Sequence, residues 1–361
     1  MKDKENNKVL ISVPNLSEVG GVSSFWNALF TAFKSLNSTA FKSIEIGGHG
    51  KNIFGAVWDQ WRFYRAMTSE VKLGLVNPSL LNKSFFRDGF FAKQLAWKNI
   101  PFVVFFHGWE LDFEAEVDKK YVNFFMNSFG KAEKIFVLSL DFKKKIEEWG
   151  YKGEVIVETT NADGTLVDNY TLAHRRSVLE DDKEFKILYL ARLIREKGAF
   201  ELLEAFNILS TKYKNIELII AGGGEDFDAL KSLVANKENV RVLGDVVGEA
   251  KINLFKESHV YALPSYYGEG LPTTILEAML FGLPLISSDA GGLKHFFEDD
   301  KMGFLVETKN ANDVATKIEK YLLDREKMFE ISKYNFNYAQ DKLTNVAMAK
   351  RLDKHLTELV G

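Results

Sequence analysis

Two glutamates flank the start of an expected helix in the segment SYYGEGLPTTILEAMLFGLPLISSD, residues 265–289. Glu269 lies in a glycine-rich turn, and Glu277 lies eight positions later, inside a helix that Pro272 suits as first residue and Gly282 as terminator. The start of a helix carries unpaired N–H groups and a partial positive charge, which suit a phosphate group.

The spacing of the two carboxylates fits a ligand that extends to both sides of such a phosphate. Glu277 is expected about five residues, or roughly 7 Å, into the helix, with its side chain leaning back toward the start. A ligand with phosphate in its middle and a hydroxyl-rich ring at each end would meet one carboxylate per ring, as a nucleotide diphosphate sugar does. The alternative is a solvated loop glutamate and a helix glutamate with no shared ligand.

Two further segments could bind the same phosphate. The stretch LYLARLIREKGAFELLEAF, residues 188–206, places Arg192 and Lys197 in the turn between a strand and a helix. Two cations there can neutralise a diphosphate, and arginine can do so with two parallel hydrogen bonds; the alternative is an ordinary basic turn. Gly20 and Gly21 follow the first expected strand, where the lack of a side chain permits close approach of the backbone to a ligand.

The elements that must position these residues are alternating strands and helices. Short apolar runs such as KVLISV, PFVVFF and KIFVL are each followed by a helix-like stretch. The pattern lapses into a polar connector at residues 164–184 and restarts with KILYLA, IELIIAG and VYALPS. Continuous Val/Ile/Leu runs separated by helices indicate parallel strands covered on both faces. The sequence therefore predicts an α/β fold of two doubly wound, Rossmann-like domains, with ligands beyond the carboxyl ends of the strands.

Composition narrows the class of protein. The 361 residues suit two domains, and 46% hydrophobic with 27% charged residues describe a globular chain. The net charge of −3 implies no nucleic-acid partner, and the absence of cysteine excludes disulfides, thiolate nucleophiles and cysteine-bound metals. The N-terminal apolar run is too short for a signal peptide, so we expect a cytoplasmic chain with at most peripheral contact at the inner face of a membrane.

The motifs together resemble the retaining glycosyltransferases of the GT-B fold, family 4, also called glycosyl transferases group 1. EGLPTTILE is similar to the E-x7-E motif of that family, ARLIREKG to its phosphate-binding turn, and VPNLSEVGGVSSF to its first glycine loop. FFHGWE, TTNADGTL and ISSDAGGLKHFFEDDKMGFLVE resemble further family segments. The chain departs from the usual pattern in having an extra Gly268 before Glu269, and Asn161-Ala162-Asp163 where an Asn-Gly-x-Asp turn is common.

The resemblance implies roles for individual residues on the donor side. Glu269 would hold hydroxyls of the donor sugar, assisted by the backbone N–H groups of Gly270, Leu271 and Thr273. Glu277 would accept hydrogen bonds from the ribose hydroxyls.

Arg192 and Lys197 would stabilise the charge that grows on the leaving diphosphate. His107 would reach the donor sugar or the reaction centre, the alternative being a structural histidine. No second carboxylate stands out as a nucleophile, so front-face transfer with retention is expected, without a metal or other cofactor. The aspartates Asp226 and Asp228 fall at a helix start, where they complement the dipole, and are not expected to bind metal.

The resemblance also implies how the chain is divided. Residues 1–170 would form the acceptor-side domain and residues 171–336 the domain that binds the nucleotide sugar across a cleft, with a C-terminal helix at 337–361 packing back on the first. The acceptor would be a saccharide or a lipid-linked saccharide, and the pathway one of surface or envelope polysaccharide synthesis.

A basic and aromatic segment lies in the first of these domains. Residues 51–100 hold eight Lys or Arg against three Asp or Glu, and Phe54, Trp58 and Trp61 share one helical stripe. The simpler expectation is that such stripes pack on the sheet. The alternative is that residues 54–97 contact an anionic membrane surface.

Two other functions remain open. A nicotinamide-dependent oxidoreductase would share the α/β layers but should show a G-x-G-x-x-G fingerprint with a downstream acidic residue, and AGGGEDFD at 221–228 lacks that spacing. A sugar-nucleotide binder without transferase activity, or a related epimerase or hydrolase, would keep Glu277 and the two cations. Ligand binding without transfer to an acceptor would distinguish this class.

Overall fold

The structure, a computed structural model, describes residues 8–17, 21–47, 53–181, 183–267 and 271–360. Among these residues, no helix is both long enough and apolar enough to cross a membrane.

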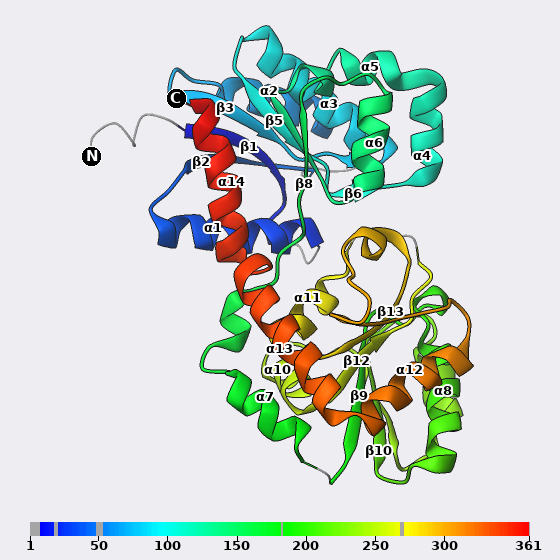
Figure 1. The fold of residues 1–361 in the computed structure, drawn as a ribbon. Coiled ribbons are helices and arrows are strands. Elements are labelled where there is room, and N and C mark those ends of the chain that lie inside the picture. Colours follow the sequence, from blue (N-terminus) through cyan, green and yellow to red (C-terminus); the bar gives the residue numbers. More distant parts are fainter. Residues whose placement is uncertain (1–7, 18–20, 48–52, 182, 268–270, 361) are drawn as a thin grey trace. The chain divides into compact units, whose positions relative to one another are not determined.

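The chain forms two compact units (Figure 1). The first unit comprises Met1–Thr160 together with Asn345–Gly361, and the second unit comprises Asn161–Thr344. The division after Thr160 differs from the expected one after residue 170. The chain returns to the first unit at Asn345 and not at residue 337, because helix α13 (Arg325–Lys342) stays with the second unit.

The described part of the first unit contains a six-stranded sheet in the order β2-β1-β3-β5-β7-β8, in which all neighbouring strands are parallel. A two-stranded sheet pairs β4 with β6. The elements in chain order are β1 (Lys8–Pro14), α1 (Gly21–Leu36), β2 (Ala40–Ile46), α2 (Ile53–Ala66), β3 (Val71–Val76), β4 (Ser79–Leu80), α3 (Asn82–Trp97), β5 (Phe102–Phe105), β6 (Gly108–Trp109), α4 (Leu111–Glu116), the π-helix η1 (Val117–Tyr121), α5 (Val122–Met126), the 3-10 helix η2 (Phe129–Lys131), β7 (Lys134–Val137), α6 (Leu140–Glu148), β8 (Glu154–Val157) and α14 (Asn345–Val360).

Hydrophobic packing on both faces explains why these strands are apolar runs. Val9, Ile11 and Val13 of β1 pack with α1 and α14, whereas Leu10, one position out of phase, belongs to the core on the opposite face. Helix α14 contributes Met348, Ala349, Leu352 and Leu356, spaced along one helical stripe, to the core it shares with α1.

Strand β2 was not predicted from the sequence. It is the edge strand of its sheet, and in AFKSIEI every residue before the buried Ile46 is partly or fully exposed. An edge strand with one solvated face lacks the continuous apolar run that identifies central parallel strands.

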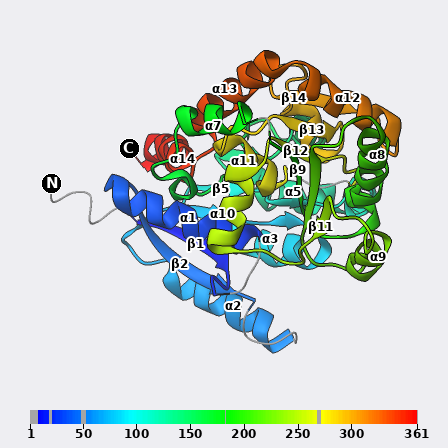
Figure 2. The same ribbon diagram turned by 90° about the horizontal axis from the view of Figure 1, so that it is seen from below.

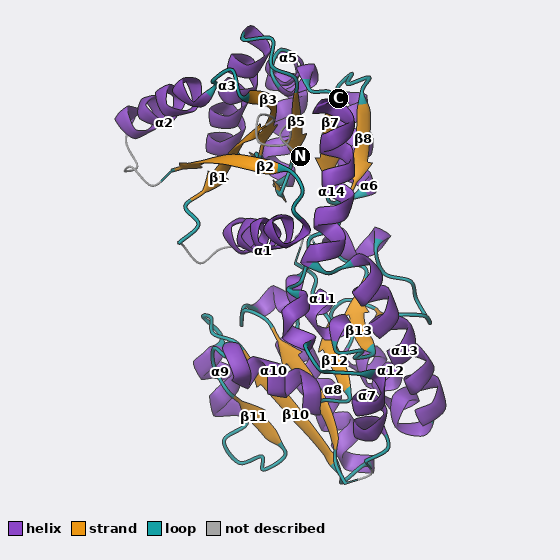
Figure 3. Cartoon of the chain, turned by 90° about the vertical axis from the view of Figure 1, so that its left-hand side faces the viewer, coloured by secondary structure: helices purple, strands orange, loops and turns teal. Residues whose placement is uncertain are grey.

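The described part of the second unit contains a six-stranded parallel sheet in the order β11-β10-β9-β12-β13-β14. Helices lie on both faces of the sheet (Figure 3), around one continuous core. The elements are the 3-10 helix η3 (Gly164–Val167), α7 (Leu172–Leu179), β9 (Phe185–Leu190), the 3-10 helix η4 (Arg195–Lys197), α8 (Ala199–Lys212), β10 (Ile216–Ala221), α9 (Phe227–Leu233), β11 (Val240–Val242), α10 (Gly248–Glu257), β12 (Val260–Leu263), α11 (Thr273–Leu280), β13 (Leu285–Ser288), the 3-10 helix η5 (Gly291–His295), β14 (Gly303–Val306), α12 (Ala311–Leu323) and α13 (Arg325–Lys342).

The two sheets confirm the predicted α/β class with two Rossmann-like domains. The stripe of Phe54, Trp58 and Trp61, in contrast, does not pack on the sheet. These side chains are 78%, 48% and 48% exposed, so the simpler expectation for them is wrong. The residues of α2 that face inward are Gly55, Asp59, Phe63 and Ala66. A helical period reveals a stripe of apolar residues but not which way the stripe faces.

Candidate functional site

The candidate site residues of the second unit surround the point where its strand order reverses. Strand β9 lies between β10 and β12, so the loops that follow β9 and β12 leave the sheet in neighbouring positions. Such a switch point is where open α/β sheets bind their ligands. The loop after β9 carries Arg192 and Lys197, and the loop after β12 leads to α11.

Close backbone contacts hold these loops together. Gly198 has φ +79°, and a Cβ there would collide with the carbonyl group of Pro264. Two hydrogen bonds join the same loops, since the Tyr266 N–H donates to Glu196 O at 2.8 Å and Ser265 Oγ donates to Glu196 O at 3.2 Å. The position of Lys197 is therefore fixed relative to the segment that precedes α11.

The loop after β10 packs equally closely on the loop after β9. A Cβ at Gly222 would collide with Ala191 O, and one at Gly224 with Leu193 O. AGGG thus serves backbone packing at this edge of the sheet. Among the described residues, no group of three or more His, Cys, Asp or Glu is arranged to hold a metal ion. Asp226 and Asp228 are therefore not part of such a group.

Lys197 is a buried cation next to a second cation. Lys197 is only 4% exposed, and its Nζ lies 4.9 Å from the centre of the Tyr267 ring. Burial is the larger cause and repulsion from Arg192 the smaller one, and together they lower the pKa of Lys197 to about 8. Arg192 itself is exposed. A bound anion would relieve both effects, because it would stabilise the charged ammonium group against desolvation and against its neighbour.

Helix α11 begins at Thr273, with Pro272 as the N-cap in an extended conformation (ψ 127°) and not as the first helical residue. Tyr261 ties its first turn to the sheet, since its hydroxyl donates to Leu190 O at 2.9 Å and lies 2.7 Å from Thr274 Oγ1. Thr273 is exposed at the helix start. The N-terminus of α11 is thus held at the end of β9, on the same edge as the two cations.

The remaining residues of this segment divide between described and undescribed positions. Leu271 is buried against the core of the second unit. Glu269 and Gly270 lie outside the described residues, as does Gly20.

Glu277 lies one turn inside α11 and forms an ion pair that the sequence did not predict. Lys251 Nζ of α10 donates to Glu277 Oε1 at 2.7 Å, and both side chains are largely buried, at 23% and 13% exposure. Burial raises the pKa of Glu277, Lys251 opposes that shift, and the nearby Asp163 adds to it. Lys251 therefore favours the ionised carboxylate, whose second oxygen can accept a hydrogen bond from a ligand.

His107 lies at the carboxyl end of β5 in the first unit, beside the switch point between β1 and β3. Asn77 Nδ2 donates to Ser12 O at 2.6 Å, which leaves Asn77 Oδ1 to face His107 Nε2 at 3.1 Å. Because Oδ1 can only accept, this network assigns the proton to Nε2 and a lone pair to Nδ1. Asn77, like Lys251 in the second unit, is a partner that the sequence did not predict.

Aromatic rings enclose the imidazole of His107. The Phe105 ring stacks on it with centroids 4.3 Å apart, and Phe25 meets it edge-on at 4.8 Å. Although part of the residue reaches the surface, burial of the ring lowers the pKa of His107 to about 3. His107 is consequently neutral at physiological pH. Gly21 begins α1, and a Cβ there would meet no atom within 4 Å.

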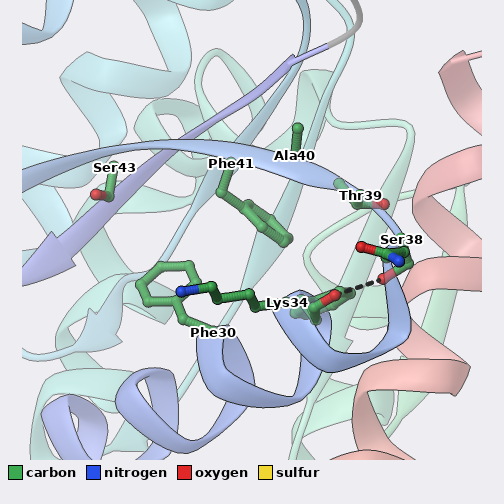
Figure 4. A pocket seen from close by; sticks show the side chains of 9 residues that line it. Phe30, Lys34, Ser38, Thr39, Ala40, Phe41 and Ser43 are labelled. Carbon is green, nitrogen blue, oxygen red and sulfur yellow. Dashed lines mark hydrogen bonds between the residues drawn. The ribbon is translucent and has the colours of Figure 1, made fainter. Parts of the chain in front are cut away.

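The structure thus brings Arg192, Lys197, Leu271, Thr273 and Glu277 to one edge of the second unit, whereas His107 and Gly21 belong to the first. A cavity of about 490 Å³ beside α1 lies elsewhere, near the amino end of β2. Figure 4 shows Phe41 pointing from that strand toward α1, with Phe30 and Lys34 on the helix below. The lining of this cavity contains none of the predicted site residues.

Comparison with known proteins connects these features to a family. Residues 171–338 match the family model described as glycosyl transferases group 1. The match covers most of the second unit and supports that family there, while the first unit lies outside the matched range.

Two curated relatives carry related names. The O-antigen biosynthesis glycosyltransferase WbnH of Escherichia coli is 34% identical over 188 residues, which cover 52% of this chain and 49% of WbnH. The putative teichuronic acid biosynthesis glycosyltransferase TuaC of Bacillus subtilis is 26% identical over 226 residues, which cover 62% of this chain and 55% of TuaC. The chain spans about half the length of the curated relatives it matches.

Similarity to a solved structure extends over nearly the whole chain. Alr3699/HepE of Anabaena, solved in complex with UDP and glucose, is similar with a TM-score of 0.69 at 18% identity, covering 97% of this chain and 99% of that one. At this identity the likeness shows a shared fold of two Rossmann-like domains.

Proposed function

We propose that this chain, whose second unit matches glycosyl transferases group 1, is a glycosyltransferase that moves a sugar from a nucleotide diphosphate sugar to a saccharide or lipid-linked saccharide. The observation that carries the proposal is Lys197, a buried cation beside Arg192, in a loop fixed to the segment before α11. A buried cation with a lowered pKa is a costly feature that a diphosphate would compensate. The names of WbnH and TuaC favour a role in surface polysaccharide synthesis.

The two cations and the start of α11 would act on the leaving group. As the bond between the sugar and the diphosphate breaks, negative charge grows on the diphosphate oxygens. Lys197 is buried in its loop, so it would stabilise that charge with little reorganisation, and Arg192 beside it would add a second positive charge. Because they supply the positive charge that a metal ion supplies elsewhere, we propose transfer without a metal or other cofactor.

Glu277 and Glu269 would hold the two ends of the donor. Glu277, kept ionised by Lys251, would accept hydrogen bonds from the ribose hydroxyls. Glu269, with the backbone N–H groups of Gly270, Leu271 and Thr273, would hold the hydroxyls of the transferred sugar. Gly20 and Gly21 would leave room for the ligand beside the first unit's switch point.

His107 would act as a neutral hydrogen-bonding group in the reaction. Its Nε2–H is held by Asn77, so Nδ1 can accept from a hydroxyl of the sugar or the acceptor. No carboxylate is assigned as a nucleophile, and we therefore propose front-face transfer with retention of the anomeric configuration.

The test has a binding arm and a transfer arm. Calorimetry with UDP, GDP, ADP and TDP identifies the base, and UDP is tried first because HepE was solved with it. Transfer from the matching radiolabelled sugar nucleotide to saccharide and lipid-linked acceptors is then measured with and without EDTA, and NMR of the product gives the anomeric configuration. Binding without transfer to any acceptor would favour the non-catalytic class, and activity that EDTA abolishes and magnesium restores would overturn the metal-independent mechanism.

A further inference from the structure

Helix α2 presents its most hydrophobic face to solvent. The inward positions are occupied by small or polar residues except for Phe63. The outward positions carry the large apolar side chains, which are Phe54 (78% exposed), Val57 (63%), Trp58 (48%) and Trp61 (48%). Their spacing of three and four residues places them on one stripe of the helix. The helix is thus amphipathic in the reverse of the usual sense.

The exposed rings form an ordered surface. Trp58 and Trp61 stack with centroids 4.7 Å apart, and the Arg65 guanidinium lies 5.5 Å from the Trp61 ring. Trp97, at the end of α3, is 71% exposed, stacks on Tyr64 of α2 and lies near Lys98. We call these outward side chains of α2 together with Trp97 the α2 face. Figures 2 and 3 both show α2 at the outer side of the first unit.

The apolar surface continues between α2 and α3. A cavity of about 520 Å³ there has Val57 and Phe90 in its lining, and Phe90 is itself half exposed. Lys83 and Arg87 line the same cavity. Contiguous apolar surface of this kind marks an interaction site when it occurs on a folded protein.

The charge around the α2 face is predominantly positive. Residues 51–100 contain three acidic residues, and two of them, Asp59 and Asp88, are buried. Asp59 accepts a hydrogen bond from the Gly47 N–H at 2.8 Å, and Asp88 accepts from Arg87 Nε at 2.8 Å. The exposed Arg65 and the cations near Trp97 and Phe90 are therefore opposed by few surface carboxylates in this segment.

We propose that the α2 face docks on an anionic lipid bilayer, with the axis of α2 lying in the plane of the membrane. Aromatic rings beside Lys and Arg are the combination that the interface of an anionic bilayer accommodates, because the rings enter the headgroup region while the cations remain near lipid phosphates. A second copy of this chain fits less well. A symmetric dimer through this face would bring Arg65 and its neighbours close to the same cations of the other copy.

The docking surface does not depend on the proposed transfer reaction. If the acceptor is lipid-linked, docking would bring the enzyme to the surface where that acceptor resides. The two ideas can fail separately, because membrane binding is measured without donor or acceptor.

The test is co-sedimentation of the full chain with vesicles of equal parts phosphatidylglycerol and phosphatidylcholine, compared with phosphatidylcholine alone. Wild type should bind the anionic vesicles more tightly, and the preference should fall as salt is raised. Vesicles with brominated acyl chains should quench part of the tryptophan fluorescence, since Trp58 and Trp61 would enter the interface.

Two variants separate the contributions of the rings and of the charges. Replacing Phe54, Trp58 and Trp61 together by serine should lower the affinity for vesicles more than tenfold, since binding scales with buried apolar area. Replacing Arg65 and Lys98 by glutamine should reduce affinity for the anionic vesicles by about tenfold and leave the weak binding to phosphatidylcholine unchanged.

The matched control is Leu233→Ser combined with Leu323→Ser, which removes exposed apolar side chains from the second unit and should leave vesicle binding unchanged. Nucleotide affinity and the melting temperature show whether each variant is folded. Wild type that ignores anionic vesicles, or a triple serine variant that binds them as tightly as wild type, overturns the proposal. Ultracentrifugation in which wild type is a dimer, the triple variant a monomer and neither binds vesicles would assign the face to self-association instead.

Discussion

His107 and Lys197 show how the same physical cause produces opposite chemistry in the two units. Each lies at the carboxyl edge of a parallel sheet, beside the point where strand order reverses, and burial lowers the pKa of each. For His107 the pKa of about 3 leaves a neutral ring at physiological pH. For Lys197 the pKa of about 8 leaves mostly a cation, held close to Arg192. The first unit therefore offers a neutral hydrogen-bonding group, and the second unit offers a charge that lacks full solvation.

The contrast separates what the two units can recognise. A cation that is short of solvent favours a phosphate, which every nucleotide diphosphate sugar has, and this unit is the one that the family model matches. A neutral imidazole discriminates between hydroxyl groups by geometry. The exposed aromatic surface of α2 also belongs to the first unit.

The largest effect is expected from Lys197→Met. Loss of one preorganised donor to the leaving group should lower kcat by roughly 10²–10³-fold. Because the folded pKa of Lys197 is below its ordinary value, its charged form destabilises the folded state below a pH of about 8, and Met should raise the melting temperature at pH 7. Steady-state kinetics and thermal melting measure the two effects. Arg195→Met, which removes an exposed cation from the same loop, is the control. An equal loss of kcat in both variants would show that Lys197 does not stabilise the leaving group specifically.

His107→Ala should reduce turnover by about a hundredfold while nucleotide diphosphate affinity stays nearly unchanged. The ring lies in the first unit, whereas the phosphate-binding residues lie in the second. Since the pKa of His107 is about 3, protonation of this ring should give no acid limb in the rate between pH 5 and pH 8. Kinetics paired with calorimetry checks the split, with His355→Ala as a histidine control. A rate limb near pH 6.5 that disappears in the His107 variant would show that the ring titrates normally.

Glu277→Gln and Glu269→Gln should differ in what they weaken. Glu277→Gln impairs a charge-assisted hydrogen bond to the ribose, so affinity for the nucleotide diphosphate should fall by roughly ten- to a hundredfold, or about 1.5–3 kcal/mol. Glu269→Gln should lower transfer and leave that affinity nearly unchanged, because its partner hydroxyls belong to the sugar. Calorimetric titration with the nucleotide diphosphate alone compares them. Equal losses of affinity would mean that the ligand does not cross the start of α11.

Lys251→Met should have the smallest effect and the clearest dependence on pH. Burial already raises the pKa of Glu277, and loss of the lysine removes the cation that opposes the shift. The carboxyl group of the variant should then take up its proton at higher pH. Affinity for the nucleotide diphosphate should fall by about tenfold near neutral pH, and the acid limb of affinity should move upward.

Lys251→Arg keeps the charge and should restore most of the affinity, and Lys256→Met removes a different lysine from α10. Titrations at several pH values distinguish these variants. An acid limb at the same pH in Lys251→Met as in wild type would show that the ion pair does not control the ionisation of Glu277.

The sequence predicted the grouping of Arg192, Lys197 and Glu277 because strand and helix patterns place all three at the carboxyl edge of one sheet. It could not predict Lys251 or Asn77. Both meet their partners through the packing of separate elements, and no short-range spacing records such contacts.

The sequence also identified the stripe of α2 but not its direction. Hydrophobic period reports that apolar residues share a face, and the usual rule turns that face inward. In α2 the small residues Gly55 and Ala66 face the protein and the tryptophans face outward, so the rule gives the wrong side. The loop of Glu269 lies outside the described residues, and its role stays a prediction.

Helix α14 belongs to the first unit but follows the whole of the second unit in the chain. The core between β1 and α1 contains Met348, Leu352 and Leu356, which are synthesised only after all of the second unit. A nascent chain that has completed residues 1–160 therefore still exposes the apolar face that α14 will cover. The second unit, uninterrupted in the chain, can reach its native state on the ribosome first, reversing the order in which domains of growing chains usually mature. Until α14 has been synthesised and has packed, the uncovered face of the first unit is where chaperones would be expected to bind.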